Sequence, residues 1–203
     1  MPAAADFVYL ASQSPRRAQL LEQLGVRYRR LVADHGEDTE ALEAIRGQES
    51  PVAYVKRVTR LKLDAATERA ERQGLAPAPI LCSDTTVALG RSILGKPESP
   101  AEASRMLRQL SGATHRVLTA VAVQQGRRRM EALSISRVTF APMTNAQIKS
   151  YVASGEPMGK AGAYAVQGKV AMYISHISGS YSGIMGLPLH ETAWLLRAAG
   201  LKI

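Results

Sequence analysis

The stretch FVYLASQSPRRAQLLEQLG, residues 7–25, contains the two kinds of element whose alternation decides the fold. FVYLA is a short run rich in β-branched and aromatic residues, and it predicts a strand from Phe7 to Ala11. Ser14 and Pro15 supply the cap and the first position of a helix, and Gly25 ends that helix after Leu24. A strand followed at once by a capped helix is typical of α/β proteins.

The same alternation continues along the rest of the chain, and no internal repeat, low-complexity tract or linker interrupts it. The sequence therefore predicts one α/β domain over residues 1–203. From capping residues, proline, glycine and apolar runs, we expect further helices over 50–74, 99–112, 144–154 and 191–199, and further strands over 78–89, 115–123, 130–140 and 169–177.

Composition excludes several classes of protein. The chain has 203 residues and 46% hydrophobic residues, but no uncharged apolar stretch approaches the ~20 residues of a membrane span. The first residues do not resemble a secretory signal, and a single cysteine, Cys82, rules out a disulfide framework and a cysteine zinc site. We therefore expect a cytoplasmic protein without a membrane partner.

A formal net charge of +9 raises the question of a polyanionic partner. Arginine occurs in two short runs, around Arg27–Arg30 and at Arg127–Arg129, and the second run follows Gly126 at an expected hairpin tip. No recognition helix, zinc finger or RNA-binding aromatic signature accompanies them. We interpret both runs as solvated surface and do not expect a nucleic-acid partner.

The beginning of the first helix breaks a local rule. Arg16 and Arg17 occupy its first turn, where acidic residues are preferred because the N-terminus is the positive end of the helix dipole. Together with Ser14 and the free N–H groups of that turn, two guanidinium groups could bind a phosphate. The alternative is that both arginines point into solvent at a cost of a few tenths of a kcal/mol, and this stretch alone does not decide between the two.

Two further residues are candidates for a polar site. Asp84 and Thr85 stand near the end of an apolar strand, and open α/β sheets usually build their sites at strand ends, although a lone aspartate can also cap a turn. Lys62 lies on the same helical face as Val55 and Val58. It either extends outward to solvent or projects into a polar cleft at the edge of the core.

The stretch GRSILGKP matches seven positions of the P-loop pattern, with Lys96 in the lysine position. The eighth position should be Ser or Thr but is Pro97, which also disfavours a helical conformation at Lys96. Gly90 and Arg91 fit a two-residue hairpin turn better. We reject the P-loop and keep Lys96 as a cation that can reach back towards Asp84.

Six motifs in register carry a resemblance that covers nearly the whole chain: LASQSPRRAQLLEQLGV, SDTTV, LGKP, MLRQLSGATHRVLTAVAV, GEPMGKAGAYAVQG and GSYSGIMGLPLHET. With these motifs the chain resembles the Maf family, once named for septum formation, whose members are nucleoside triphosphate pyrophosphatases. The resemblance implies a mixed twisted sheet in two lobes around a central cleft, related to the inosine triphosphatase fold. It also implies a homodimer.

Within that family, GAYAVQG is similar to the branch that hydrolyses dTTP and UTP. The resemblance implies that Asp84 is the proton acceptor. It implies further site residues as follows: Glu37, Lys62 and Lys96 in catalysis, Glu37 and Asp84 as ligands of Mg²⁺ or Mn²⁺, Ser14, Arg16 and Arg17 as phosphate ligands, and Arg16, Thr85 and Gln167 as specificity residues. The amide of Gln167 has both a donor and an acceptor for the edge of a pyrimidine base.

The chain departs from the family pattern at two places. Gly159 stands where the family often has an aspartate, just before the lysine of KAGAY. The segment ADHGEDTEALE matches poorly, so Asp34 or Asp38 can replace Glu37 as the acid of the motif.

The expected reaction is metal-assisted hydrolysis of dTTP or UTP, and of modified pyrimidine nucleotides, to the monophosphate and pyrophosphate. Two alternatives stay open. One is a regulatory protein that binds nucleotide or nucleic acid without turnover. The other is an enzyme that removes purine triphosphates.

Overall fold

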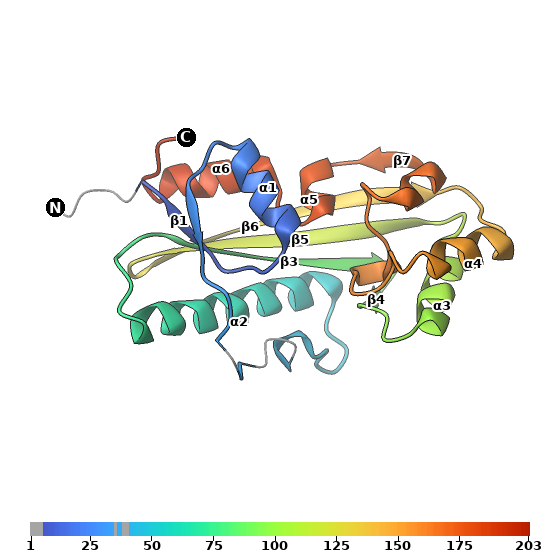
Figure 1. Cartoon of the computed structure of the whole chain (residues 1–203), viewed down its shortest axis with the longest axis horizontal. Helices are drawn as coiled ribbons and strands as arrows, with labels where there is room; N and C mark the ends of the chain where they lie inside the picture. The colour runs from blue at the N-terminus through green and yellow to red at the C-terminus, as the bar shows by residue number, and fades with distance from the viewer. Residues whose placement is uncertain (1–5, 35, 38–40) are drawn as a thin grey trace.

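The computed structural model describes residues 6–34, 36–37 and 41–203, and one mixed sheet connects its parts (Figure 1). The strand order is β2-β1-β3-β5-β6-β7, and β4 pairs with β3. β1 is parallel to β2 and β3, whereas all other pairs are antiparallel. The strands are β1 Val8–Leu10, β2 Tyr28–Arg30, β3 Ile80–Leu89, β4 Ser92–Leu94, β5 Thr114–Gln125, β6 Arg128–Phe140 and β7 Ile174–Ser178.

Six α-helices and three 3₁₀-helices complete the described residues. The α-helices are α1 Pro15–Gln23, α2 Pro51–Arg72, α3 Pro100–Leu110, α4 Asn145–Ala153, α5 Tyr181–Met185 and α6 Leu189–Ala198. The 3₁₀-helices are η1 Ala41–Glu43, η2 Ala161–Ala163 and η3 Lys169–Tyr173. Within these residues no helix has the length and apolar composition that crossing a membrane requires.

The first lobe is a sheet covered on both faces. Successive side chains of a strand point to opposite faces, so Val8 and Leu10 pack against α1 and α6, whereas Tyr9 packs against α2. Cys82 is fully buried in the α2 layer, as expected for a small apolar side chain. α2 thus crosses one face of the sheet, and α1 and α6 cover the other (Figure 1).

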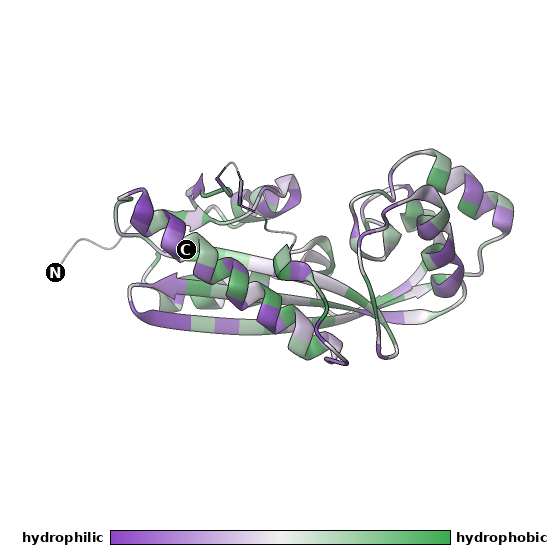
Figure 2. Ribbon diagram, turned by 90° about the horizontal axis from the view of Figure 1, so that it is seen from below, coloured by the Kyte–Doolittle hydropathy of each residue, from purple (hydrophilic) through white to green (hydrophobic). Residues whose placement is uncertain are grey.

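The second lobe is built on the opposite halves of the long strands β3, β5 and β6 (Figure 2). Its core combines α3 and α4 with the glycine-rich segment 161–166, and Phe140 and Leu107 are among its fully buried side chains. Because the same strands run through both lobes, segments of the first lobe face segments of the second lobe over the sheet between them. The α/β class and the mixed sheet agree with the sequence-based expectation.

The predicted helix beginnings are largely confirmed. Ser50 accepts a hydrogen bond from the N–H of Ala53, and Thr144 forms a reciprocal capping box with Gln147. Ser99 caps α3 as expected, but the carboxylate of Glu102 accepts from the N–H of Glu98, one residue further out than in a capping box.

Three elements differ from the expectation. The predicted strand over 169–177 is a strand only from Ile174, because residues 169–173 form η3 and bury Val170 in the second lobe. The run at Arg27–Arg30 is not all plain surface, since Tyr28–Arg30 form the edge strand β2. The last helix begins at Leu189 rather than Glu191, and α5 precedes it.

Candidate functional site

A cavity of about 530 Å³ opens between the two lobes. Its walls come from the segment that joins β1 to α1, the inner face of α2, the middle of β3, the turn after β4, and the glycine-rich segment 159–167. These segments are far apart in the sequence, and each contributes polar side chains. The cavity contains most of the candidate residues of the sequence, which are Ser14, Arg16, Arg17, Lys62, Asp84, Thr85, Lys96 and Gln167.

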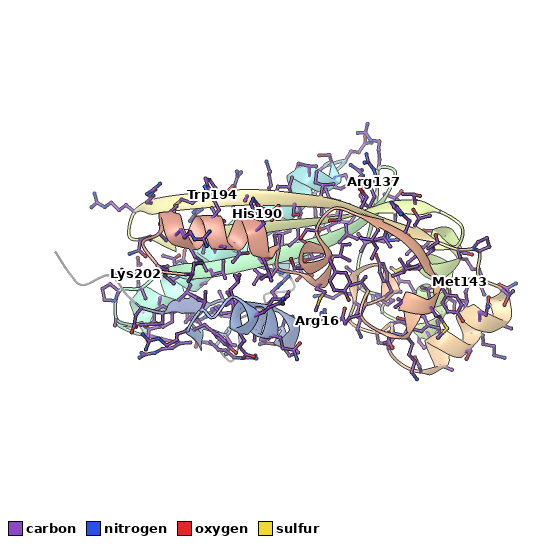
Figure 3. All side chains as sticks on the ribbon, turned by 90° about the horizontal axis from the view of Figure 1, so that it is seen from above. Arg16, Arg137, Met143, His190, Trp194 and Lys202 are labelled. Carbon is purple, nitrogen blue, oxygen red and sulfur yellow. The ribbon has the colours of Figure 1, made fainter. Side chains whose placement is uncertain are left out.

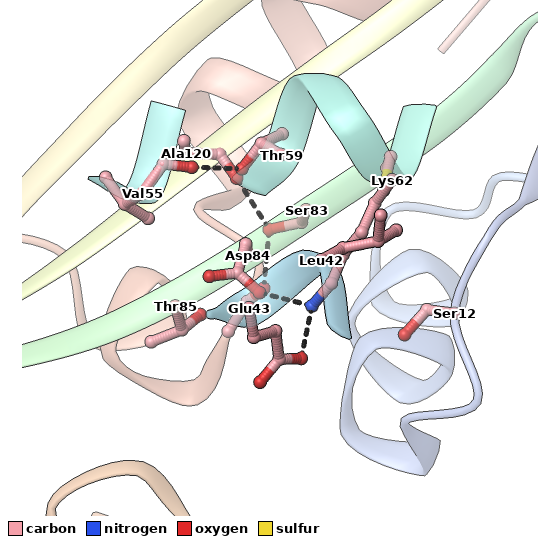
Figure 4. A network of polar contacts seen from close by, with 12 residues as sticks. Ser12, Leu42, Glu43, Val55, Thr59, Lys62, Ser83, Asp84, Thr85 and Ala120 are labelled. Atoms are coloured by element: carbon pink, nitrogen blue, oxygen red, sulfur yellow. Dashed lines mark hydrogen bonds and ion pairs between the residues drawn. The ribbon is translucent and has the colours of Figure 1, made fainter. Parts of the chain in front are cut away.

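The centre of the cavity is a chain of ion pairs (Figure 4). Lys62 Nζ lies 2.6 Å from Asp84 Oδ1 and 2.6 Å from Glu43 Oε1. Lys96 Nζ lies 2.9 Å from the other carboxylate oxygen of Glu43. Lys62 therefore does not extend to solvent but projects from the apolar face of α2 into the cleft. Lys96 reaches this cluster through Glu43 rather than through Asp84.

Burial and charge act against each other in this cluster. Burial by itself would raise the pKa of Glu43, but the charges and hydrogen bonds of Lys62 and Lys96 outweigh it, so the pKa is lowered. Burial would lower the pKa of Lys62, yet Asp84 and Glu43 raise it. Burial and the two carboxylates together raise the pKa of Tyr54 to about 12. The lowered pKa of Glu43 and the raised pKa of Lys62 both favour the ion pair between these two side chains at neutral pH.

The loop that carries Glu43 is fixed to α2 by Arg57. Its Nη2 donates to the carbonyl of Ala44 at 2.9 Å, and its Nε donates to Glu49 at 2.9 Å. The hydroxyl of Tyr54, one turn earlier on α2, donates to the carbonyl of Glu43 at 2.8 Å. The Arg57 guanidinium lowers the pKa of Glu49 to about 2. These contacts hold the Glu43 carboxylate next to Lys62.

The structure does not bring Glu37 to this cluster, in contrast to the expected metal pair of Glu37 and Asp84. The carboxylate of Glu37 binds Arg69 and Arg72, which lie on α2 seven or more residues beyond Lys62, about 10 Å along the helix. Asp34 is also away from the cluster, with Arg72 and Gln73 as its partners. Asp38, the other alternative, lies outside the described residues.

Sequence reasoning missed Glu43, the acid that does lie beside Asp84. The feature that could have pointed to Glu43 is the ion pair of Glu49 and Arg57, which shapes the loop that carries Glu43. This ion pair cannot be recognised before the fold is known. Among the described residues, Glu43 and Asp84 are the two carboxylates that line the cleft.

The first turn of α1 leaves its donors available. Ser14 makes no side-chain cap, unlike the serines that begin α2 and α3. Arg17 is partly committed, because its Nε donates to the carbonyl of Gly186 at 2.9 Å and its Nη1 to Ser12 Oγ at 3.2 Å. Arg16 makes no hydrogen bond or ion pair with any described residue, and it lies on the side of α1 that faces the second lobe (Figure 3). The two arginines therefore differ in role.

Gly186, whose carbonyl accepts from Arg17, has a backbone conformation that favours glycine. Its φ is +118°, a left-handed conformation that residues with a side chain rarely adopt. A Cβ at this position would lie 3.4 Å from Arg17 Nε and 3.5 Å from Thr85 Oγ1. Both distances are ordinary van der Waals contacts, so the backbone conformation rather than a lack of space favours glycine at this position.

The two remaining specificity candidates line the cavity from opposite lobes. Thr85 Oγ1 lies 3.0 Å from Thr119 Oγ1, a contact within the sheet. Gln167 is exposed in the glycine-rich segment and makes no hydrogen bond with a described residue. Its amide is therefore available to a ligand in the cavity.

The donor set fits a hard divalent cation only in part. Among the described residues no group of three or more His, Cys, Asp or Glu side chains is placed to hold a metal ion. Glu43 and Asp84 supply carboxylate oxygens on either side of Lys62, and Mg²⁺ is usually held by one or two carboxylates together with substrate phosphates and water. The cleft therefore fits a cation that arrives with a phosphorylated ligand.

Comparisons with known proteins agree over nearly the whole chain. The family model described as Maf-like protein matches residues 7–199. A dTTP/UTP pyrophosphatase of Polaromonas sp. strain JS666 is 90% identical over 200 residues, which are 98% of this chain and 99% of that protein. A dTTP/UTP pyrophosphatase of Albidiferax ferrireducens is 64% identical over 98% of this chain and 100% of its own. A protein of the same description from Burkholderia pseudomallei is 55% identical over 95% of this chain and 93% of its own.

Proposed function

The chain belongs to the Maf family, and we propose that it is a nucleoside triphosphate pyrophosphatase that hydrolyses dTTP and UTP. The observation that carries this proposal is the cleft in which Lys62 is held between Asp84 and Glu43, beside Arg16, which has no carboxylate partner among the described residues. Hydrolysis of the bond between the α and β phosphates consumes one water molecule. It yields the nucleoside monophosphate, pyrophosphate and a proton.

The cleft residues supply what phosphoryl transfer needs, which is positioning and charge neutralisation. Arg16 and Arg17 bind phosphate oxygens at the beginning of α1, and Lys62 and Lys96 neutralise charge near the scissile bond. Asp84 orients the attacking water and accepts its proton, because its carboxylate lines the cleft and is held in place by Lys62. Glu43 holds both lysines in place from the other side.

A divalent cation, Mg²⁺ or Mn²⁺, would be held by Glu43 and Asp84 together with phosphate oxygens of the substrate. When bound, it supplies neutralisation of the phosphate charge. Selectivity for the base comes from Gln167, whose free amide lies at the cavity wall, and from Thr85 and Arg16.

We also propose that the protein is a homodimer and that it is cytoplasmic. A homodimer is supported by large apolar side chains that are exposed in the single chain, among them Ile135, Tyr181 and Trp194. A cytoplasmic location is supported by the free, buried thiol of Cys82. Sedimentation equilibrium on the purified protein measures the first, and a monomer at micromolar concentration would contradict it.

The test of the proposed activity is pyrophosphate release from a panel of triphosphates, with and without Mg²⁺ or Mn²⁺. We expect dTTP and UTP to be hydrolysed faster than ATP, GTP, 7-methyl-GTP and inosine triphosphate, and only with a metal. Binding of dTTP without release of pyrophosphate would favour a regulatory protein, and faster hydrolysis of the purine nucleotides would contradict the pyrimidine assignment.

A further inference from the structure

The charges that line the cleft do not balance. Of the residues that the structure describes, six cationic side chains and two carboxylates form its walls. The cations are Arg16, Arg17, Lys62, Arg69, Lys96 and Lys160, and the carboxylates are Glu43 and Asp84. An excess of half-buried positive charge is unfavourable in the free protein and favours an anionic ligand.

Most of these cations are already engaged. Lys62 and Lys96 are paired with the two carboxylates of the cleft. Arg69 is paired with Glu37 outside the cleft, and Arg17 is tied to a main-chain carbonyl and a hydroxyl. Two cations are left without a carboxylate within ion-pair distance among the described residues, namely Arg16 from the first lobe and Lys160 from the second.

The surroundings of Lys160 explain why it has no acidic partner. Its ammonium donates to the main-chain carbonyl of Glu156, not to the carboxylate of that residue. The two carboxylate oxygens of Glu156 are used elsewhere, by the hydroxyl of Tyr151 at 3.0 Å and by the N–H of Lys169 at 3.1 Å. The preceding residue, Gly159, lines the cleft and brings no charge. The ammonium of Lys160 is thus fixed at the wall of the cleft without a direct ion pair to a carboxylate of a described residue, and Glu156 compensates its charge only from a distance.

Arg16 and Lys160 affect each other across the cleft. Burial lowers the pKa of Lys160, and the positive charge of Arg16 lowers it further. Burial also lowers the pKa of Arg16, with a smaller contribution from Arg17. Two cations that repel each other from opposite walls of one cavity form a site that an anion between them would stabilise.

We propose that Lys160 is a phosphate-contacting residue and that it holds, together with Arg16, one phosphate group of the ligand between the two lobes. This inference takes from the proposed function only the identity of the ligand, which is a nucleoside triphosphate that yields pyrophosphate. The site is separate from the cluster of Lys62, Asp84 and Glu43, and it needs neither the metal nor the base.

Binding of inorganic pyrophosphate tests the inference directly. The dissociation constant is measured by isothermal titration calorimetry in the presence of EDTA, so that no metal contributes. We expect Lys160→Gln to weaken pyrophosphate binding at least about tenfold, as for loss of a hydrogen bond between charged groups. Lys160→Arg keeps the charge, and we expect it to bind within about threefold of the wild type.

The glutamine variant also separates binding from structure. A glutamine amide can still donate to the Glu156 carbonyl, so a purely structural role of Lys160 would leave Lys160→Gln with wild-type affinity. The matched control is Lys169→Gln, which removes the same charge from an exposed side chain of the neighbouring η3 that does not line the cleft. We expect this control to bind as the wild type, with all three variants melting within a few degrees of it.

Three results would overturn the inference: no pyrophosphate binding by the wild type, wild-type affinity in Lys160→Gln, or equal weakening in Lys169→Gln. Turnover of dTTP by the wild type is measured on the same preparation. Wild-type pyrophosphate binding that depends on Lys160, without dTTP turnover, would refute the proposed function and support the anion pair. Turnover together with unaltered binding by Lys160→Gln would refute the anion pair alone.

Discussion

The substitution Asp84→Asn removes one negative charge from the cleft with almost no change in volume. Asp84 is 6% exposed, and its Oδ1 lies 2.6 Å from Lys62 Nζ. We expect this variant to lose at least about a hundredfold in turnover of dTTP, because general-base catalysis by a positioned side chain typically contributes 10²–10⁴-fold. The fold should survive the change.

The expected cost in stability follows from the contacts that remain. Breaking a fully buried ion pair by removal of one partner costs about 3–5 kcal/mol. Lys62 keeps Glu43 at 2.6 Å, and its side chain is 17% exposed, so its ammonium is not left without a counter-charge. The asparagine oxygen can still accept a hydrogen bond from it. We therefore expect a loss of about 1–2 kcal/mol, a decrease of roughly 2–8 °C in Tm for a chain of this size.

Both quantities are measured on one preparation, turnover by pyrophosphate release and stability by a thermal melt. The control is Asp64→Asn, on a residue of α2 that also binds a cation, in this case the exposed Arg129 of β6. An exposed pair contributes about 0–1 kcal/mol, so the control should keep its turnover and nearly all of its stability. A folded Asp84→Asn protein with turnover within a few-fold of the wild type would refute the role of Asp84.

The remaining predictions concern the base, the arginines and the loop that carries Glu43. Gln167→Leu should reduce the preference for dTTP and UTP over purine triphosphates more than it reduces total turnover, since a lost hydrogen bond costs about 1–3 kcal/mol; unchanged relative rates would make Gln167 structural only. Arg16→Glu should abolish hydrolysis while the ligand-free protein melts at the same temperature or slightly higher, because an acid suits the helix N-terminus. Arg17→Glu should abolish hydrolysis and also lower Tm, because Arg17 binds the carbonyl of Gly186; equal melting curves would show that this bond contributes nothing. The pKa of Glu49 is lowered to about 2, so the stability that its pair with Arg57 contributes is complete above the ordinary glutamate pKa and is lost as the pH falls towards 2. In Glu49→Gln, the stability against unfolding should fall less steeply as the pH is lowered over this range. An unchanged pH dependence in this variant would show that the pair is not responsible.

The fold could be predicted where local chemistry decides it. The Ser-Pro and Thr-Gln beginnings of the helices are recognisable because capping depends on residues three or four positions apart. β2 was not predicted, because its three residues become a strand only by pairing with β1 at the edge of the sheet. The segment 169–173 has the composition of a strand, yet burial of Val170 in the second lobe favours a 3₁₀ turn there.

The site residues also fall into those that the sequence could predict and those that it could not. The sequence provided reasons to choose Asp84, Lys62 and Lys96 as candidates, because a strand, an amphipathic helix and a hairpin each limit the direction of one side chain. It left open whether Lys62 points to solvent or into the cleft, and it directed Lys96 towards Asp84 rather than towards Glu43. The acid that joins them was not predicted. Glu43 reaches Lys62 through a loop held by Arg57 and Tyr54, and contacts between a loop and a distant helix leave no periodic signal in the sequence. The same holds for Lys160, whose lack of an acidic partner depends on how Tyr151 and Lys169 engage Glu156.

The central claim is that Glu43, Lys62 and Asp84 form the hydrolytic cluster and that Glu37 lies outside it. It is tested most directly by kcat for dTTP in Glu43→Gln and Glu37→Gln, two identical substitutions of acids that each bind a cation of α2. We predict that Glu43→Gln loses at least about a hundredfold in kcat, whereas Glu37→Gln stays within a few-fold of the wild type. A large loss in Glu37→Gln together with near wild-type turnover in Glu43→Gln would contradict the account.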